Sequence, residues 1–426
     1  MKKLLAVLLL SSLFFTGCSS ASAQPGGTVQ PGIDLDYVPK VPDAESDYPL
    51  EAMGGKTAFA YFNDEGLAAG WNLGNTLDAW GGGKSGEDVN WGNPKANQAV
   101  FNGVKEAGFT IVRIPVTWLG HIGPAPDYKI QESFLRRVAE VAGYAHNAGL
   151  KVIINLHHDG STDGNGRDNG WLSINTARRS EAGYNQVTAE FVRVWKQIAL
   201  YFKNHGDWLM FESLNELHDG GWGYSPESQQ RPQYEIINKW NQLFTDVVRK
   251  TGANNASRYL VIHGYCTRPQ HTLASYFALP DDSVPDRQVV GFHYYDPYEF
   301  GILGDQKGGR SNWGTPAEKQ RTDTDLKPFK AKFIDKSIPV VMDECGAVLQ
   351  LYPGDKAKEN QARQNRLDYL AWVFGKASEY GIVPIYWDNG GFTGGGEKFG
   401  LFNRTTGQPH CEECEAVIET MIDAVK

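Results

Sequence analysis

The feature that most constrains the fold is a regular alternation of short β-branched segments with longer amphipathic stretches, from about residue 55 to the C-terminus. Stretches such as 132–149 and 359–381 carry apolar residues three and four positions apart, which is typical of helices. Eight strand-helix pairs in roughly 370 residues predict an α/β fold, a (β/α)₈ TIM barrel with long loops at its C-terminal mouth. The predicted strands span residues 69–75, 110–116, 151–158, 208–215, 258–264, 288–295, 338–344 and 382–388.

The first 17 residues are predicted to form a lipoprotein signal peptide. Lys2 and Lys3 precede an apolar run over 4–15, and small residues with Cys18 follow. The run of ~12 apolar residues is shorter than the ~20 that a spanning helix requires. "FTGC" resembles a bacterial lipobox, although Phe15 stands where an aliphatic residue is usual. We therefore expect an exported bacterial lipoprotein of the cell surface or outer membrane, anchored through Cys18; an ordinary cleaved signal peptide is the alternative.

Composition divides the rest of the chain into a tether and one folded domain. Residues 18–50 are rich in Ser, Pro, Gly and Asp and lack an apolar period, which predicts a flexible tether; residues 51–426 form the expected barrel domain. The net charge of -9 argues against a nucleic-acid partner and against contact with anionic lipid beyond the anchor. We expect a monomer that acts on a neutral partner.

Nearly every predicted strand ends in a polar or aromatic side chain that can carry chemistry. One such residue could simply cap a strand or anchor a loop, but eight strand ends together indicate a site at the mouth of the barrel. The candidates are Asn75, Arg113, His157, His158, Asn215, Glu216, His293, Tyr295, Glu344, Trp387 and Asp388.

Two of these candidates are carboxylates that can face each other across the mouth, Glu216 and Glu344. Glycoside hydrolysis uses one carboxyl group as a proton donor and a second, ionised one to attack the anomeric carbon. Arg113 and Tyr295 could donate hydrogen bonds to Glu344 and keep it ionised, and Asn215 could bind the 2-hydroxyl of the sugar. His157, His158 and His293 could orient the carboxylates and the ring hydroxyls.

At this point the sequence resembles glycoside hydrolase family 5, the cellulase family, within the clan of retaining (β/α)₈ glycosidases. The resemblance covers about residues 55 to 425 and implies an enzyme without a metal or other cofactor. It implies Glu216 as the acid/base, Glu344 as the nucleophile, and Arg113, His157, Asn215, His293, Tyr295 and Trp387 as the other active-centre residues. The motifs that carry it are "GWNLGNTLDAW", "WGNP", "VRIPVTW", "INLHHDG", "LNE", "HYYDPYEF", "DECG", "YWDNG" and "GGGEKFGLFNR".

Two positions depart from the family pattern, and both follow a catalytic glutamate. Leu217 stands where proline often follows the Asn-Glu pair, and Cys345 stands where an aromatic residue is usual. We interpret Cys345 as a small buried thiol and not as a nucleophile. The pair Cys411 and Cys414 lacks the further ligands of a zinc site, so it forms either a local disulfide or two thiols.

Flat aromatic rings suit the CH-rich faces of glucose, so tryptophans after the strands are candidate sugar-binding residues. Trp387 is expected beside the cleaved bond, and Asn75 and His158 are expected to contact the substrate. We predict no metal site in "HHD", residues 157–159, because consecutive residues of a strand face opposite ways. The other tryptophans in loops that follow strands are Trp80, Trp118, Trp171 and Trp222.

Long glycine-rich loops predict an open cleft and therefore internal cleavage of a polysaccharide. The motifs are most similar to the subfamily that contains endoglucanases, xyloglucanases and lichenases, and the roomy loops favour branched xyloglucan as substrate. A cellulase or lichenase acting on unbranched or mixed-linkage glucan is the alternative. A non-catalytic glycan-binding lipoprotein would have lost one carboxylate, and a metal-dependent hydrolase would need ligands that the sequence does not suggest.

The fourth strand carries a second glutamate, Glu212, on the same face as Glu216. Four residues at ~3.3 Å each place Glu212 ~13 Å below Glu216, which predicts a buried, paired, structural carboxylate. Strict alternation would point Asn215 away from Glu216. If both serve the site, the backbone between Leu214 and Leu217 has to twist or bulge.

Overall fold

The computed structural model describes residues 33–37, 48–80, 89–160, 170–224, 227–393 and 396–426; the side chains of 227–230 are not described. Residues 31–426 form one compact unit. The predicted signal peptide and its lipidation site, Cys18, lie outside the described residues. Across the described ranges, no helix has both the length and the apolar character needed to cross a membrane.

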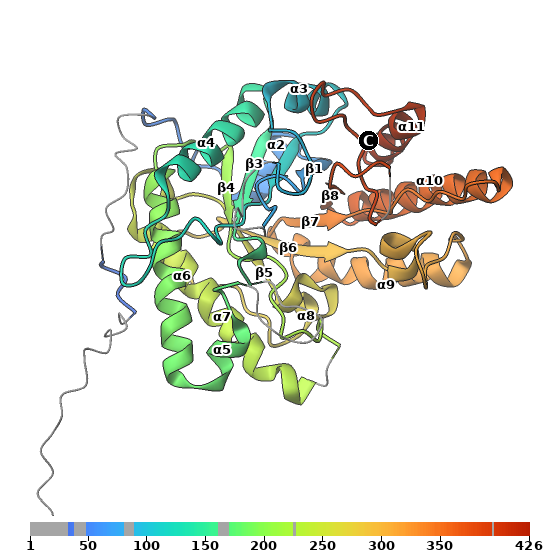
Figure 1. The fold of residues 1–426 in the computed structure, drawn as a ribbon. Helices are drawn as coiled ribbons and strands as arrows, with labels where there is room; N and C mark the ends of the chain where they lie inside the picture. Colours follow the sequence, from blue (N-terminus) through green and yellow to red (C-terminus); the bar gives the residue numbers. More distant parts are fainter. Residues whose placement is uncertain (1–32, 38–47, 81–88, 161–169, 225–226, 394–395) are drawn as a thin grey trace, which may run out of the picture. The chain divides into compact units, whose positions relative to one another are not determined.

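Eight parallel strands in the described chain close into a barrel in sequence order, from β1 through β8 and back to β1 (Figure 1). This confirms the predicted (β/α)₈ fold. Seven of the strands lie within the ranges predicted from the sequence, and β7 extends one residue past its range, to Cys345. The strands are short because only their central residues pair; their ends turn outward into loops. Their bounds are β1 Gly70–Leu73, β2 Ile111–Ile114, β3 Lys151–Asn155, β4 Leu209–Glu212, β5 Leu260–His263, β6 Gln288–Tyr294, β7 Val340–Cys345 and β8 Ile382–Asp388.

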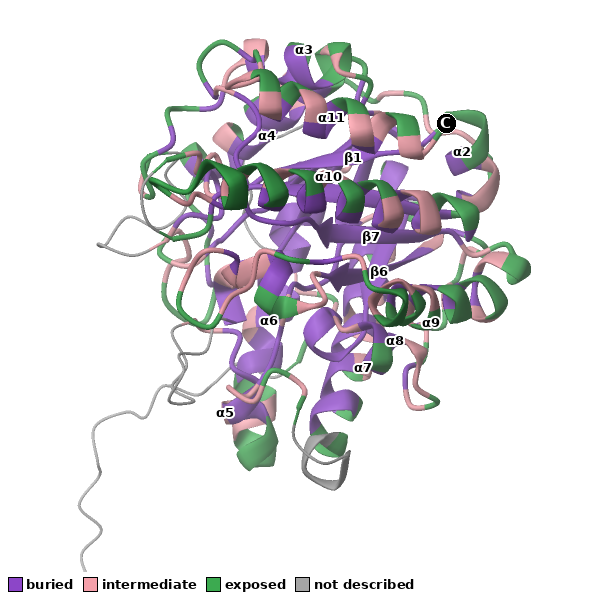
Figure 2. Cartoon of the chain, turned by 90° about the vertical axis from the view of Figure 1, so that its right-hand side faces the viewer, coloured by how far each residue is buried: buried purple, intermediate pink, exposed green. Residues whose placement is uncertain are grey.

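Helices surround the barrel, each with a buried stripe toward the strands and an exposed outer face, as α10 shows in Figure 2. Because each helix returns the chain from the mouth to the opposite end, the loops after the strands all gather at one end. The helices are α2 Ala58–Asp64, α3 Gln98–Glu106, α4 Glu132–Asn147, α5 Ile174–Arg179, α6 Glu181–Tyr201, α7 Glu227–Lys250, α8 Pro269–Leu273, α9 Pro316–Lys332, α10 Lys356–Glu379 and α11 Glu412–Ala424.

The N-terminal end of the barrel is closed by apolar packing. Tyr61 and Phe62 of α2 belong to the same buried cluster as the side chains that fill the barrel interior, including Met210 and Val341. The rings of Tyr61 and Tyr259 lie 4.6 Å apart. The interior of this end is therefore filled by packed apolar side chains.

Part of the expected tether packs on the barrel. The Lys196 Nζ donates to the carbonyl of Leu35 at 2.6 Å, and Asn204 donates to the carbonyl of Tyr48 at 2.9 Å. Both donors lie on or next to α6. Residues 33–37 and 48–50 therefore belong to the folded unit, which begins before the boundary expected at residue 51.

Two irregularities in the sheet shape the mouth. The register shifts between β6 and β7 so that Phe292 pairs with Met342 but His293 pairs with Glu344. A second shift lies between Met342 and Cys345, where β7 meets β8. The extra residue, Asp343, forms a bulge, and a bulge redirects the side chains around it.

Candidate active site

Glu216, which follows β4, and Glu344, on β7, meet at the mouth with His293 of β6 between them. The ligand-type atoms of these three side chains all lie within 4.8 Å of one another. Nδ1 of His293 donates to Oε1 of Glu216 at 2.8 Å and lies 3.4 Å from Oε2 of Glu344. The structure thus brings together the two carboxylates that the sequence paired.

Arg113 of β2 supports Glu344 from below. Its Nη1 donates to Oε1 of Glu344 at 2.7 Å, and its Nε and Nη2 donate to the two oxygens of Glu212 at 2.7 and 2.8 Å. Asn155 donates to Glu212 at 2.8 Å, and Glu212 is fully buried. Glu212 is therefore the paired structural carboxylate that we predicted, and it fixes the arginine that holds Glu344.

The backbone after β4 departs from extended geometry. Such a departure was expected, because a regular strand would point Asn215 and Glu216 in opposite directions. The strand ends at Glu212, a bend lies at Asn215, and the N–H of Leu217 donates to the carbonyl of Asn215 at 2.8 Å. Arg113 Nη2 donates to Oδ1 of Asn215 at 2.8 Å. Both Asn215 and Glu216 consequently face the site, and the prediction of a distortion between Leu214 and Leu217 is confirmed.

The charges at the site are coupled through His293. Burial would lower the pKa of His293, but the negative charges of Glu344 and Glu216 raise it above its ordinary value. Burial would raise the pKa of Glu216, but the hydrogen bond and charge of His293 lower it overall. Burial raises the pKa of Glu344 against the opposing charges of His293 and Arg113. The pKa values of His293, Glu216 and Glu344 therefore depend on one another.

A second ion pair lies beneath the first. Nε2 of His263, at the end of β5, lies 2.6 Å from Oδ2 of Asp343, which occupies the β7 bulge. Burial acts against charge on both groups, but each partner outweighs it: the pKa of His263 rises to about 9 and that of Asp343 falls to about 2. Nε2 of His293 lies 3.6 Å from Oδ1 of the same aspartate. Our sequence analysis missed His263 and Asp343, although His263 ends its strand as the other candidates do.

Tyr295 donates from its hydroxyl to Oε2 of Glu344 at 3.0 Å, as predicted. Burial, together with the charge of Glu344, raises its pKa well above the ordinary value, so it remains a donor. His157 lies 3.9 Å from Glu344 and its pKa falls well below the ordinary value because it is buried. Its Nδ1 lies 3.1 Å from Nδ2 of Asn155, which fits a neutral ring that accepts at Nδ1.

We expected the side chains of His157, His158 and Asp159 to face alternate ways, and the structure agrees only in part. Asp159 turns away and accepts from the N–H groups of Trp118 and Trp171. The two histidine rings, however, lie side by side with centroids 4.4 Å apart. The reason is that β3 ends at Asn155 and a 3-10 turn begins at His158.

Asn75 enters the mouth on a strained turn after β1. Its φ is 53°, a left-handed conformation that asparagine tolerates better than most residues. The carboxylate of Asp78 accepts from the N–H groups of Asn75 and Thr76 at 3.1 and 2.7 Å and so fixes the turn. Nε2 of His158 lies 3.8 Å from the same carboxylate.

The predicted sugar-binding tryptophans divide into surface and core. Trp387 lies at the end of β8 with its ring stacked on His157, centroids 5.7 Å apart, and Trp222 is 46% exposed in the loop after β4. Trp80 and Trp171 are half-buried. Trp118 is fully buried, packs edge-on against Phe134 and donates to the carbonyl of Asn155. Its assignment to substrate binding is therefore wrong, because its ring belongs to the core beneath the loop.

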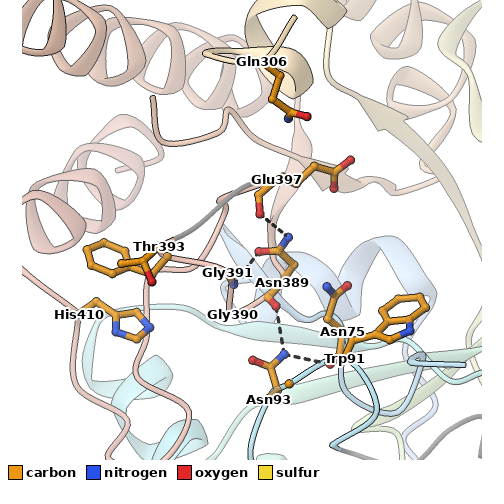
Figure 3. Close-up of a pocket in the computed structure, with 13 residues that line it drawn as sticks. Asn75, Trp91, Asn93, Gln306, Asn389, Gly390, Gly391, Thr393, Glu397 and His410 are labelled. Carbon is orange, nitrogen blue, oxygen red and sulfur yellow. Dashed lines mark hydrogen bonds between the residues drawn. The ribbon is translucent and has the colours of Figure 1, made fainter. Parts of the chain in front are cut away.

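A cavity of 860 Å³ lies among loops that include those after β1 and β8. Figure 3 shows side chains that line it, among them Asn75, Asn93 and Asn389. Trp91, which is 41% exposed, forms part of its wall and ties its indole N–H to the carbonyl of Trp80. Asn93 braces the floor by donating to the carbonyls of Asn75 and Asn389. The motifs "WGNP" and "YWDNG" contain Trp91, Asn93 and Asn389, for which no role was predicted from the sequence. The lining residues are Asn75, Trp91, Gly92, Asn93, Gln306, Asn389, Gly390, Gly391, Phe392, Thr393, Gly396, Glu397 and His410.

The described cysteines are thiols. Cys345 is buried behind Glu344, and burial raises its pKa well above the ordinary value, in agreement with the interpretation of a small core residue. The sulfurs of Cys411 and Cys414 lie 3.0 Å apart at the start of α11.

Among the residues that the structure describes, three clusters combine ligand-type atoms within 4.8 Å: Asp78 with His157 and His158, His263 with His293 and Asp343, and Glu216 with His293 and Glu344. In each, the carboxylate oxygens already accept hydrogen bonds from N–H groups, such as Arg113 to Glu344 and His263 to Asp343. These arrangements suit the holding of protons better than the coordination of an ion.

Comparisons with known proteins agree with this geometry. A family model described as cellulase, glycosyl hydrolase family 5, matches residues 74–393. Endoglucanase A of Paenibacillus barcinonensis is 36% identical over 358 residues, which cover 79% of this chain and 84% of that protein. A xyloglucan-specific endo-beta-1,4-glucanase of Bacteroides ovatus is 36% identical over 357 residues, which cover 81% of this chain and 66% of that protein. The solved structure of a broad-specificity endoglucanase from Bacteroides salanitronis matches with a TM-score of 0.77 and 39% sequence identity. The match covers 88% of this chain and 97% of that one.

Proposed function

The chain belongs to the cellulase family, glycosyl hydrolase family 5, as an endo-β-1,4-glucanase, and we propose that it cleaves with retention of configuration and prefers xyloglucan. The observation that supports retention is the separation of the two carboxylates. Oxygen atoms of Glu216 and Glu344 lie within 4.8 Å of each other. Retaining enzymes hold their carboxyl groups ~5 Å apart, whereas inverting enzymes leave ~6.5–9.5 Å for a water molecule.

In the first step, an oxygen of Glu344 attacks the anomeric carbon and the bond from that carbon to the leaving glucosyl oxygen breaks. The leaving oxygen takes a proton from Glu216, which receives it along its hydrogen bond with His293, and becomes a free 4-hydroxyl. Arg113 and Tyr295, which donate to Glu344, hold the nucleophile in place as its charge passes into the ester bond. Asn215 has its Oδ1 fixed by Arg113, so its amide N–H groups remain to donate to the sugar 2-hydroxyl.

The second step returns the enzyme to its starting state. Glu216, now a carboxylate, removes a proton from water, the water oxygen attacks the anomeric carbon, and the ester bond to Glu344 breaks. Formation of the ester removes the negative charge that keeps the pKa of His293 high. The His293–Glu216 pair, which gave up its proton in the first step, therefore stays deprotonated until Glu216 takes a proton from water.

Retention can be observed directly. In ¹H NMR spectra recorded during the first minutes of hydrolysis of a cello-oligosaccharide, we expect the β-anomer of the new reducing end to appear first and the α-anomer to follow by mutarotation. Initial appearance of the α-anomer would contradict the proposed two-step mechanism.

We propose a preference for xyloglucan because the site has open space on what we take to be its glycone side. The 860 Å³ cavity over β1 and β8 is lined largely by glycines and by polar side chains such as Gln306 and Glu397, which can accept the hydroxyls of a branch sugar. A xyloglucan-specific enzyme and a broad-specificity endoglucanase are both among the similar proteins. Hydrolysis of unbranched or mixed-linkage glucan is therefore the alternative substrate preference.

Initial rates on xyloglucan, carboxymethylcellulose, mixed-linkage glucan and mannan decide between these substrates. We expect the highest kcat/KM on xyloglucan and measurable hydrolysis of the two unbranched glucans. A higher kcat/KM on carboxymethylcellulose would overturn the preference while leaving the endoglucanase assignment intact.

We propose, in addition, that the enzyme is an exported monomer held at the membrane by a lipid on Cys18. The sequence around that cysteine supports this, and the residue lies outside the described part of the chain. Metabolic labelling with a tritiated fatty acid should mark the wild-type protein and not a Cys18→Ala variant. Equal labelling of the two would refute the anchor.

A further inference from the structure

The cavity over β1 and β8 accounts for sugars on one side of the cleaved bond, whereas a separate group of exposed aromatic side chains lies beyond Glu216. We propose that Trp222 and Tyr224, in the loop after β4, bind the leaving side of the glucan chain and that Trp222 determines the preference for long substrates. This inference rests on the endo-glucanase function proposed above. It assigns residues to the half of the substrate that departs in the first step.

The position of Trp222 follows from its contact with His218. The two rings are stacked with centroids 3.9 Å apart and planes 29° from parallel. His218 is buried two residues after Glu216, and its charge acts on the Glu216 carboxyl. Trp222 therefore packs against a buried side chain that is only two residues along the chain from the group that protonates the leaving oxygen.

The polarity of the cleft follows from the roles of the two carboxylates. The nucleophile, Glu344 of β7, must face the anomeric carbon, and β7 adjoins β8, over which the cavity opens. The acid, Glu216, must face the bridging oxygen, and the chain beyond that oxygen is the leaving group. The loop that carries Glu216 continues directly to Trp222 and Tyr224, so these rings lie on the leaving side.

The loop is held so that its rings stay exposed. Nη1 of Arg268 donates to the carbonyl of Trp222 at 3.1 Å, and its guanidinium lies 3.8 Å from the centre of the Tyr224 ring. Nε2 of His271 lies 3.0 Å from the carbonyl of Gly223. Gly223 has a φ of 71°, and a Cβ there would lie 2.6 Å from the same His271 nitrogen.

The chemistry of the surface fits glucosyl rings. Trp222 is 46% exposed and Tyr224 is 71% exposed. Tyr298, from the segment after β6, is 51% exposed. Their faces offer flat apolar area to the CH groups of glucose, and the tyrosine hydroxyls can donate to sugar hydroxyls.

The test compares two substrates that share a glycone and differ in the leaving group. An aryl β-cellotrioside places only an aryl group on the leaving side, whereas cellohexaose can place several glucosyl units there. For Trp222→Ala we expect kcat/KM on cellohexaose to fall about tenfold, and the fall on the aryl cellotrioside to be several-fold smaller. Trp91→Ala, on the glycone side, should lower kcat/KM on both substrates by the same factor.

Equal losses on the two substrates for Trp222→Ala, or no loss on either, would overturn the assignment. Tyr224→Phe keeps the ring and should retain most of the cellohexaose activity, whereas Tyr224→Ala should not. Failure of the wild-type enzyme to hydrolyse either substrate would instead refute the proposed function. Matching melting temperatures between each variant and the wild type show that a loss does not come from misfolding.

Discussion

Each end of the barrel buries an arginine completely, and the two are held in opposite ways. At the mouth, Arg113 lies between two carboxylates, and these charges raise its pKa well above the ordinary value against the effect of burial. At the N-terminal end, Arg258 donates to five uncharged oxygens, and burial lowers its pKa to about 9. These acceptors are Oδ1 of Asn255 and the carbonyls of Phe202, His205, Gly206 and Leu209. The mouth arginine positions a charge for chemistry; the other ties backbone segments together.

The largest effect is expected from Arg113→Lys. A lysine keeps the charge but cannot donate to Glu212, Asn215 and Glu344 at once, because it lacks the planar fork of arginine. We expect kcat/KM to fall by roughly 10²–10³, as for the loss of one positioned donor at other active sites. Steady-state kinetics on a soluble cello-oligosaccharide measure the loss.

The matched control for this variant is Glu212→Gln, which keeps the size of the side chain and removes its charge. It should lower kcat/KM less than Arg113→Lys, because the contact between Arg113 and Glu344 survives. A kcat/KM for Arg113→Lys within threefold of the wild type would show that the guanidinium is not needed to hold Glu344.

Arg258→Lys should have the opposite profile. Several of its five acceptors would lose their donor, and each buried, unsatisfied carbonyl costs about 1–3 kcal/mol. We expect the free energy of unfolding to fall by about 2–4 kcal/mol in urea titrations, since part of the hydrogen bonding survives. At 25 °C, kcat/KM should equal that of the wild type. A tenfold or larger loss of kcat/KM without a change in the free energy of unfolding would contradict the structural role assigned to Arg258.

A buried histidine at each end of the barrel should make the free energy of unfolding depend on pH. At the mouth, the pKa of His263 is raised to about 9, so its stabilising charge is fully present below about 6.5 and is lost as pH rises through 9. The corresponding loss in the free energy of unfolding is at most about 3 kcal/mol. Urea titrations between pH 6 and 9.5 should show this decline in the wild type and a flatter profile in His263→Asn. Parallel profiles would contradict the ion pair with Asp343.

At the N-terminal end of the barrel, the dependence of stability on pH has the opposite sign. Burial lowers the pKa of His205 to about 4, so the folded protein keeps this ring neutral while the unfolded chain protonates it below about 6.5. Stability should therefore decline as pH falls from 6.5 to 4, and His205→Gln should remove part of that slope. If this variant were more sensitive to acid than the wild type, the assignment of a neutral buried ring would be wrong.

The smallest effect is expected at the rim of the mouth. Trp91→Ala removes one exposed ring and leaves the charged network unchanged, so kcat/KM on a cello-oligosaccharide should fall only about three- to tenfold. Isothermal titration of cellotriose into a Glu344→Gln background should show the same factor in Kd. A loss above a hundredfold would place Trp91 among the residues that act on the reacting atoms.

The sequence predicts the barrel well because periodicity and strand ends are local signals. Seven of the eight strands fall within the expected ranges and β7 exceeds its range by one residue. The side chains predicted for the centre meet there: Glu216, Glu344, Arg113, His293 and Tyr295. The distortion before Glu216 was also predictable, because two adjacent residues had to serve one site.

What could not be predicted depends on non-local geometry. The bulge at Asp343 exists only as a register shift between neighbouring strands, so the His263–Asp343 ion pair has no signature in either segment alone. Trp118 follows a strand like the other candidates, yet its ring turns into the core because Asn155 offers a buried carbonyl. The cavity wall at Trp91 depends on how two loops distant in sequence pack together.

The central claim is that Glu344 forms a covalent bond with the sugar at the mouth. A 2-deoxy-2-fluoro cellobiosyl fluoride slows both steps, because fluorine destabilises the oxocarbenium-like transition state, while its good leaving group lets the first step proceed. Incubation followed by mass spectrometry of the digested protein should find one added glycosyl group, on Glu344. Labelling of Glu216, or turnover without any covalent intermediate, would contradict the account.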